Sequence, residues 1–267
     1  MPSNLSCESW RIWDRETDYG LLLFKRATGE LPEMESSKAV AKTVKSLIRR
    51  GDHILDVGCG AGHYLRSLQR EIDIPFAYTG VDATAYYIEL ARQAWRGHHD
   101  VYFEVADIFL LPFNNSTYDI VISCNVFLHL PSIQVPLSEV VRVGRRHVLI
   151  RTLVGERSFR IQEVYSPETH PKSFVGHPDD DEFNESGEPK SFHYYNIYSQ
   201  AYIEKLLSKM PDVEGYSIFP DNSYDPDKIS AEISSQSPPD ITRTIGGQQI
   251  NGYILQPWHF IEISKVS

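Results

Sequence analysis

The stretch from His53 to Gly62, HILDVGCGAG, limits the possible folds of this 267-residue chain more than any other. Its first five residues form a short apolar run of the kind found in buried parallel strands. Glycine then occupies positions 58, 60 and 62, and glycine accepts positive φ angles and lets a ligand lie against the backbone. The next segment, HYLRSLQREI, places Leu65 and Leu68 on one helical face. The sequence therefore predicts a strand, a glycine turn and a helix whose N-terminus offers N–H groups to a polar ligand.

The spacing of the glycines indicates which ligand this turn binds. A dinucleotide fingerprint, G-x-G-x-x-G, requires glycine at position 63, where this chain has His63. The pattern present is Asp-x-Gly-x-Gly-x-Gly, which begins at Asp56, and DVGCGAG resembles the first motif of the class I S-adenosyl-L-methionine-dependent methyltransferases (small-molecule type, similar to types 11 and 25). The resemblance implies that the cofactor is S-adenosyl-L-methionine, that the product is S-adenosyl-L-homocysteine, and that this turn contributes Asp56, Gly58, Cys59, Gly60 and Gly62 to the cofactor site.

Apolar strand patterns and amphipathic helix patterns alternate after residue 36. Strands are predicted at 53–57, 77–82, 101–105, 118–124, 146–151 and 213–219, and helices at 36–49, 84–95, 133–143 and 199–209. This alternation is typical of an α/β fold with a parallel sheet and helices on both faces. The resemblance implies a Rossmann-like, seven-stranded, mostly parallel sheet, with residues 258–263 as an antiparallel C-terminal strand. We also expect a hairpin of 242–245 and 250–255 around Gly246 and Gly247.

Polar residues follow several predicted strands at their carboxyl ends, where open parallel sheets bind ligands. Asp82 ends the second strand, 20 residues after Gly62, and is predicted to accept hydrogen bonds from the ribose hydroxyls, with a helix N-cap as the alternative. The resemblance implies that Asp107 binds the adenine amino group, a turn residue being the alternative. Further cofactor contacts are expected from Ala83, Ile108 and Asn125.

The loop from Asn125 to Pro131, NVFLHLP, is similar to a loop of the same family. It departs from the Asn-Pro-Pro-Tyr motif of enzymes that methylate exocyclic amines of bases or amides, which counts against that class. His129 and His193 are candidate general bases because histidine titrates near neutrality. His129 can equally be a structural histidine that bonds to the loop backbone, and His193 can belong to an aromatic anchor. Aromatic residues at Trp10, Trp13, Tyr194 and Tyr195 suit a substrate pocket.

The predicted organisation is one structural domain in four parts. Residues 1–35 form an N-terminal arm or lid, 36–153 the cofactor-binding core, 154–200 an insertion on the acceptor side, and 201–267 the completion of the sheet. The insertion is polar and proline-rich. Its His170 and His177, with His193 and the acidic run 179–182, lack the tight spacing of metal ligands, so we expect no metal.

Composition narrows the range of partners. Lysine and arginine number 26 against 36 acidic residues, a net charge of −10, so the chain lacks the basic footprint of a nucleic-acid-binding protein. Three widely separated cysteines, Cys7, Cys59 and Cys124, favour reduced thiols in the cytoplasm. The N-terminus has no apolar signal region and no run is long enough to span a membrane. A small-molecule substrate is expected, with a monomer and a homodimer both open.

The predicted function is methyl transfer from S-adenosyl-L-methionine to an oxygen or nitrogen atom of a small molecule by in-line displacement. Two other classes remain as alternatives. One is a protein that binds the same cofactor without catalysis, as a regulator or partner subunit. The other is a nucleotide-dependent oxidoreductase on the same architecture, against which His63 counts because it replaces the third glycine.

Overall fold

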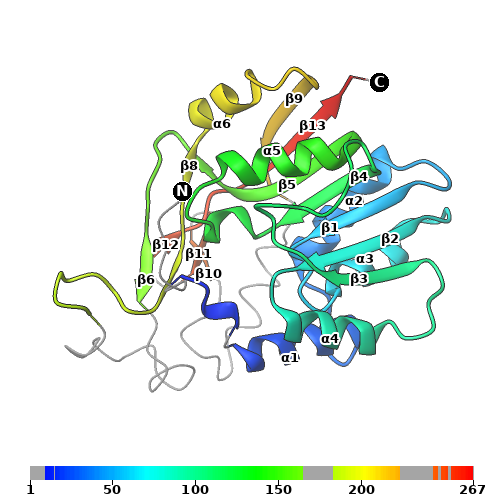
Figure 1. Ribbon diagram of the computed structural model, residues 1–267, viewed down its shortest axis with the longest axis horizontal. Helices are drawn as coiled ribbons and strands as arrows, with labels where there is room; N and C mark the ends of the chain where they lie inside the picture. The colour runs from blue at the N-terminus through cyan, green and yellow to red at the C-terminus, as the bar shows by residue number, and fades with distance from the viewer. Residues whose placement is uncertain are drawn as a thin grey trace.

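The computed structural model describes residues 10–14, 16–164, 183–222, 243–245, 248–251 and 254–266. Its centre is a mostly parallel sheet in the strand order β3-β2-β1-β4-β5-β13-β9, with the short β8 paired to the end of β5 (Figure 1). The strands are β1 (His53–Val57), β2 (Ala77–Asp82), β3 (Val101–Val105), β4 (Tyr118–Cys124), β5 (Gly144–Gly155), β8 (Tyr198–Ser199), β9 (Val213–Pro220) and β13 (Trp258–Lys265). The C-terminal strand β13 is antiparallel to both β5 and β9. The predicted fold class is confirmed, with β8 as an additional eighth strand.

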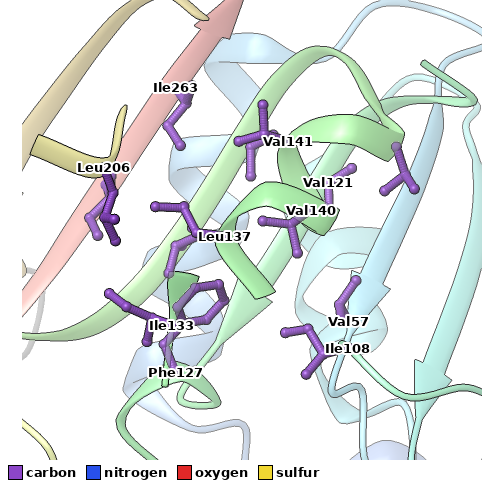
Figure 2. Close-up of a cluster of buried hydrophobic side chains, with 14 of the residues drawn as sticks. Val57, Ile108, Val121, Phe127, Ile133, Leu137, Val140, Val141, Leu206 and Ile263 are labelled. Carbon is purple, nitrogen blue, oxygen red and sulfur yellow. The ribbon is translucent and has the colours of Figure 1, made fainter. Parts of the chain in front are cut away.

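Helices cover both faces of this sheet. Along β4, Val121 belongs to one buried cluster while Ile120 and Ile122 belong to another, as the two-residue period of a strand requires. The first cluster includes Leu137 and Val140 of α5 (Gln134–Val143), and Figure 2 shows these side chains directed toward the strands. Helix α6 (Gln200–Leu207) contributes to the same cluster. Helices α2 (Glu35–Leu47), α3 (His63–Glu71) and α4 (Ala85–Ala94) pack on the opposite face.

The N-terminal segment contains a helix that the sequence analysis did not predict. Helix α1 (Thr17–Thr28) follows the short 3-10 helix η1 (Ile12–Asp14) and buries Gly20, Leu23 and Ala27. It packs against α3 and α4, and Figure 1 shows this dark blue segment beside α4 at one edge of the molecule. The segment therefore lies across the end of the sheet instead of extending away from the core.

The second half of the chain adds smaller elements beside the main sheet. The 3-10 helix η2 (Phe127–His129) follows β4, and a hairpin of β6 (Gln162–Val164) and β7 (Phe192–Tyr194) lies next to it. The region predicted as a two-stranded hairpin is a three-stranded antiparallel sheet of β10 (Arg243–Ile245), β11 (Gln248–Asn251) and β12 (Ile254–Leu255). The predicted antiparallel pairing across Gly246 and Gly247 is confirmed by β10 and β11, but residues 254–255 form a third strand of their own instead of extending the second. His170, His177 and residues 179–182 lie outside the described residues.

Candidate active site

A cavity opens at the carboxyl ends of β1 to β4, where an open parallel sheet is expected to bind its ligand. Its empty space, mouth included, is about 1010 Å³, at the upper end of the range for small-molecule sites. Residues of the N-terminal segment form one wall and the strand ends form the other. The sequence-predicted residues that line it are Trp10, Trp13, Gly58, Gly60, Asp82, Ala83, Asp107, Ile108, Asn125 and His129.

Asp82 stands at the end of β2 with both carboxylate oxygens anchored by the backbone. Its Oδ2 accepts a hydrogen bond of 2.9 Å from the N–H of Gly60, and its Oδ1 accepts one of 2.9 Å from the N–H of Thr84. Thr84, not Asp82, is the N-cap residue of α4. Burial raises the pKa of Asp82, which the two backbone bonds oppose. A carboxylate oxygen has capacity for a second hydrogen bond, so Asp82 can still receive two ligand hydroxyls.

The glycine turn brings protein groups close together as well as leaving space for a ligand. Gly58 and Gly60 have φ angles of +81° and +55°, in the left-handed region that favours glycine. A Cβ atom on Gly60 would lie 2.6 Å from Cδ1 of Leu23, and one on Gly58 would lie 2.2 Å from Cγ2 of Val126. The turn therefore has no room for side chains on the cavity wall. Leu23 of α1 can come this close only because Gly60 has no side chain.

Three predicted cofactor residues, Asp56, Cys59 and Gly62, lie behind this wall instead of lining the cavity. Asp56 is buried at the end of β1, and burial raises its pKa to about 7. Burial also raises the pKa of the fully buried Cys59 thiol. A Cβ atom on Gly62 would meet the rings of Phe103 and Trp95, both at 2.8 Å. These residues support the turn from the core side, and their contact with the cofactor stays a prediction.

The N-terminal segment is fastened to the strand ends at two points. The guanidinium of Arg11 lies 3.5 Å from Oδ2 of Asp107, whose Oδ1 accepts a hydrogen bond of 3.0 Å from the N–H of Phe109. The hydroxyl of Thr84 donates a 3.0 Å bond to Asp14. These contacts pack the N-terminal segment against the strand ends, where its residues form part of the cavity wall, and its role as a lid stays a prediction.

Two histidines meet at the far wall. His129 Nδ1 lies 2.7 Å from the carbonyl oxygen of Tyr194. A carbonyl only accepts hydrogen bonds, so Nδ1 carries the proton and Nε2 keeps a free lone pair. Burial, and then the nearby His193, lower the pKa of His129 to about 3. His193 Nε2 lies 3.0 Å from Oε2 of Glu163, its direct partner across the β6–β7 hairpin, and its Nδ1 has no hydrogen-bond partner among the described residues.

Aromatic rings enclose these histidines. The Trp13 ring lies 5.0 Å from that of His129 and 5.6 Å from that of His193, centroid to centroid. Tyr195 lies 5.3 Å and 5.0 Å from the same two rings. Trp13 and His129 line the cavity, whereas His193, Tyr194 and Tyr195 form the layer behind them. The structure thus gathers the predicted acceptor residues in one place, and their contact with the acceptor stays a prediction.

Three further residues line the cavity without having been predicted to do so: Tyr19 and Leu23 of α1, and His63 at the start of α3. His63 is buried, burial lowers its pKa to about 3, and its Nδ1 finds no partner in the part of the chain that the structure describes. The apolar spacing of Gly20, Leu23 and Ala27 is a signal for the helix α1. No comparable signal in the sequence indicates that this helix packs beside the glycine turn, about 40 residues later in the chain, and there forms part of the cavity wall.

The polar groups of this wall fit S-adenosyl-L-methionine, the cofactor that the motif resemblance implies. Asp82 offers two acceptors for the ribose hydroxyls, Asp107 offers an acceptor for the adenine amino group, and the orphaned nitrogen of His63 can accept or donate one more bond. Within the described ranges, no group of three metal-ligating side chains lies close enough to hold an ion. No helix described here is both long and apolar enough to cross a membrane.

Comparison with known proteins agrees with this geometry. Residues 54–147 match the family model described as a methyltransferase domain. An O-methyltransferase of Pyrenophora dematioidea is 32% identical over 98 residues, which cover 36% of this chain and 36% of that protein. An O-methyltransferase of Penicillium expansum is 29% identical over 130 residues, 44% and 46% of the two chains. The matches thus span less than half the length of these curated relatives.

A solved structure shares the fold. The geranyl diphosphate C-methyltransferase of Streptomyces coelicolor, crystallised with Mg²⁺, geranyl diphosphate and S-adenosyl-L-homocysteine, superposes with a TM-score of 0.53 at 14% identity. The superposition covers 85% of this chain and 77% of that one. At this identity the likeness concerns the arrangement of the sheet and its helices, and it extends well beyond the residues that the family model matches.

Proposed function

Residues 54–147 belong to the methyltransferase domain of the class I S-adenosyl-L-methionine-dependent enzymes, and on that premise we propose that the chain methylates a hydroxyl oxygen of a small molecule. The main support for the proposal is that the polar residues at the strand ends and His129 line the same cavity. The matched O-methyltransferases support oxygen over nitrogen as the accepting atom.

The cofactor supplies a methyl group on a positively charged sulfur, which an acceptor atom attacks in line with the breaking carbon–sulfur bond. The chain's own residues hold the two reactants in that line. Asp82 would bind the ribose and Asp107 the adenine end, and these contacts would orient the cofactor. The N-terminal segment, through Trp13 and Asp14, covers the cavity and excludes water that would solvate the attacking oxygen.

His129 is the group placed to take the proton of the attacking hydroxyl. Its Nδ1–H is held by the carbonyl of Tyr194, so the lone pair on Nε2 is the one available. Its low pKa keeps the ring neutral at pH 7. As the new carbon–oxygen bond forms, the hydroxyl proton passes to Nε2 and afterwards leaves to solvent. A weak base suffices here because the oxygen becomes strongly acidic as it gains the methyl group.

The walls beside His129 indicate what kind of molecule carries the hydroxyl. Trp10, Trp13 and Leu130 are apolar or aromatic cavity residues on this side. Such walls bind the flat or apolar part of a ligand, while a few polar groups orient it. The proposed acceptor is therefore a small, partly apolar hydroxylated compound.

The test is calorimetric titration of the purified chain with S-adenosyl-L-methionine, S-adenosyl-L-homocysteine and NAD, followed by a turnover assay. The expected result is micromolar binding of the first two, no binding of NAD, and formation of S-adenosyl-L-homocysteine with members of a panel of hydroxylated compounds. A parallel panel of amines tests the choice of oxygen. Tight cofactor binding without turnover on either panel would instead favour a non-catalytic binding protein, and binding of NAD alone would contradict the whole proposal.

A further inference from the structure

A buried ion pair lies directly behind the β4 end of the cavity. Nε of Arg151, on β5, donates a hydrogen bond of 2.7 Å to Oδ2 of Asp221, and the side chains are 4% and 3% exposed. The guanidinium also lies 4.0 Å from the ring centroid of Trp258, on β13. A buried ion pair is costly to desolvate and is weak evidence for stability alone. The other contacts of Arg151 therefore indicate what it holds in place.

Arg151 fixes the orientation of the Asn125 amide. Its Nη1 donates a hydrogen bond of 2.6 Å to Oδ1 of Asn125, and the N–H of Asn125 donates one of 2.9 Å to the carbonyl of Arg151. A guanidinium has donors only, so the amide oxygen must face it and the amide nitrogen must face away. Asn125 has a φ of +61°, which is uncommon outside glycine, and it lines the cavity.

The amide nitrogen of Asn125 is the atom left for a ligand. No hydrogen bond joins it to another group of the described chain. An NH₂ group offers two donors and no acceptor, so it selects an oxygen-bearing ligand group, and best an anionic one. Because the orientation comes from Arg151, the same asparagine without the ion pair could turn its oxygen toward the cavity.

The strand order indicates which ligand group reaches this point. Asp107 follows β3 and Asp82 ends β2, and next along the sheet come β1 and then β4, which ends beside Asn125. With adenine at β3 and ribose at β2, the amino-acid end of the cofactor extends toward β1 and β4. We propose that Asn125 donates hydrogen bonds to the carboxylate of that amino-acid part, and that Arg151, held by Asp221, is the positioning residue. The inference rests on the cofactor assignment of the proposed function.

The experiment compares two ligands that differ at that end only. S-adenosyl-L-homocysteine carries the amino-acid group, whereas 5′-methylthioadenosine has the adenine, ribose and sulfur without it. The variant Asn125→Asp keeps an oxygen for Arg151 but exchanges the donor for a negative oxygen. Affinity for S-adenosyl-L-homocysteine, measured by calorimetry, should fall about tenfold to a hundredfold, while that for 5′-methylthioadenosine should change less than about twofold.

The chain offers a matched control for the added charge. Asn115 is exposed, and its Oδ1 likewise accepts a hydrogen bond, of 3.1 Å, from an arginine, Arg142. Asn115→Asp therefore makes the same chemical change away from the cavity and should alter neither affinity. A second cavity variant, Asn125→Gly, removes the amide but suits the left-handed backbone, and it should show the same selective loss if Asn125→Asp does not fold.

The positioning role of Arg151 has its own readout. Arg151→Lys keeps the charge but cannot hold both Asp221 and Asn125, because an ammonium lacks the fork of a guanidinium. It should weaken binding of S-adenosyl-L-homocysteine selectively, whereas a merely structural defect would weaken both ligands together. Equal losses for both ligands, or no loss for either, would overturn the inference, as would an effect confined to the KM of the methyl acceptor. Failure of the unaltered chain to bind S-adenosyl-L-homocysteine would instead contradict the proposed function.

Discussion

The hydroxyl of Tyr78 donates a hydrogen bond of 2.6 Å to the carboxylate of Asp56, and both side chains are buried. The two residues lie on the neighbouring strands β1 and β2. Burial raises the pKa of Asp56 to about 7, while the bond from Tyr78 opposes that shift and the charge of Asp82 adds to it. The acidic residue of the glycine motif is therefore a core group whose protonation changes near neutral pH.

The first prediction concerns the pH dependence of stability. An aspartate in the unfolded chain titrates near pH 4, and Asp56 in the native state titrates at about 7. Between these values the native state binds more protons than the unfolded state, so the contribution of Asp56 to the free energy of unfolding falls as pH rises. Asp56→Asn, which stays neutral and can still accept from Tyr78, should remove this dependence.

The measurement is urea denaturation of both proteins from pH 4 to pH 8. All other titrating groups are shared, so the difference between the two free energies of unfolding isolates Asp56. That difference should shift in favour of Asp56→Asn by up to about 1.4 kcal/mol for each pH unit across the window. A difference that stays constant with pH would show that Asp56 titrates at its ordinary value in the native state.

The second prediction is that Asp82→Ala lowers affinity for S-adenosyl-L-homocysteine at least about tenfold, because hydrogen bonds from ligand hydroxyls to the carboxylate are lost. The N–H groups of Gly60 and Thr84 also lose their acceptor, so a melting curve should accompany the calorimetric titration. Asp100→Ala, a change of the same charge at an exposed loop residue, provides the control. Unchanged affinity in Asp82→Ala would exclude the ribose role.

The positions of the central strands and their parallel pairing could be predicted because each strand carries its own local pattern. The runs around Ile54 and Ile120 are apolar, turn residues bound them, and the helices between them dictate parallel pairing. The three-stranded sheet of residues 243–255 could not be predicted as such, since short polar strands depend on their neighbours more than on intrinsic preference. The same holds for β8, which has two residues.

The candidate site, like the fold, could be predicted from the sequence only in part. That Asp82, Asp107 and Asn125 line one cavity was predictable because strand ends converge by topology. The positions of Asp56 and Cys59 behind the wall were not, because a motif states which residues surround a turn and not which way each side chain points. The contact of Trp13 with His129 joins segments more than 100 residues apart in the chain, and no local pattern records such a contact.

The third prediction concerns His129 as the proton acceptor. His129→Asn can still donate to the carbonyl of Tyr194 but has no basic nitrogen, so turnover should fall about 10²- to 10⁴-fold with little change in cofactor affinity. Since the pKa of His129 is lowered to about 3, the ring is neutral above pH 4. The pH profile of kcat/KM in the unaltered enzyme should therefore show no loss from histidine protonation between pH 5 and pH 7. Full turnover by His129→Asn would leave it a structural residue.

The fourth prediction uses Trp13 to test the N-terminal cover without knowledge of the acceptor. Trp10 and Trp13 line the cavity, whereas Trp95 and Trp258 do not, so binding of S-adenosyl-L-homocysteine should change the intrinsic fluorescence through the first two. Trp13→Phe, which keeps an aromatic ring against His129, should lose much of that change, while Trp258→Phe should retain it. If Trp13→Phe retained the full change, the signal would come from elsewhere, and Trp13 would pack the arm without meeting the ligand.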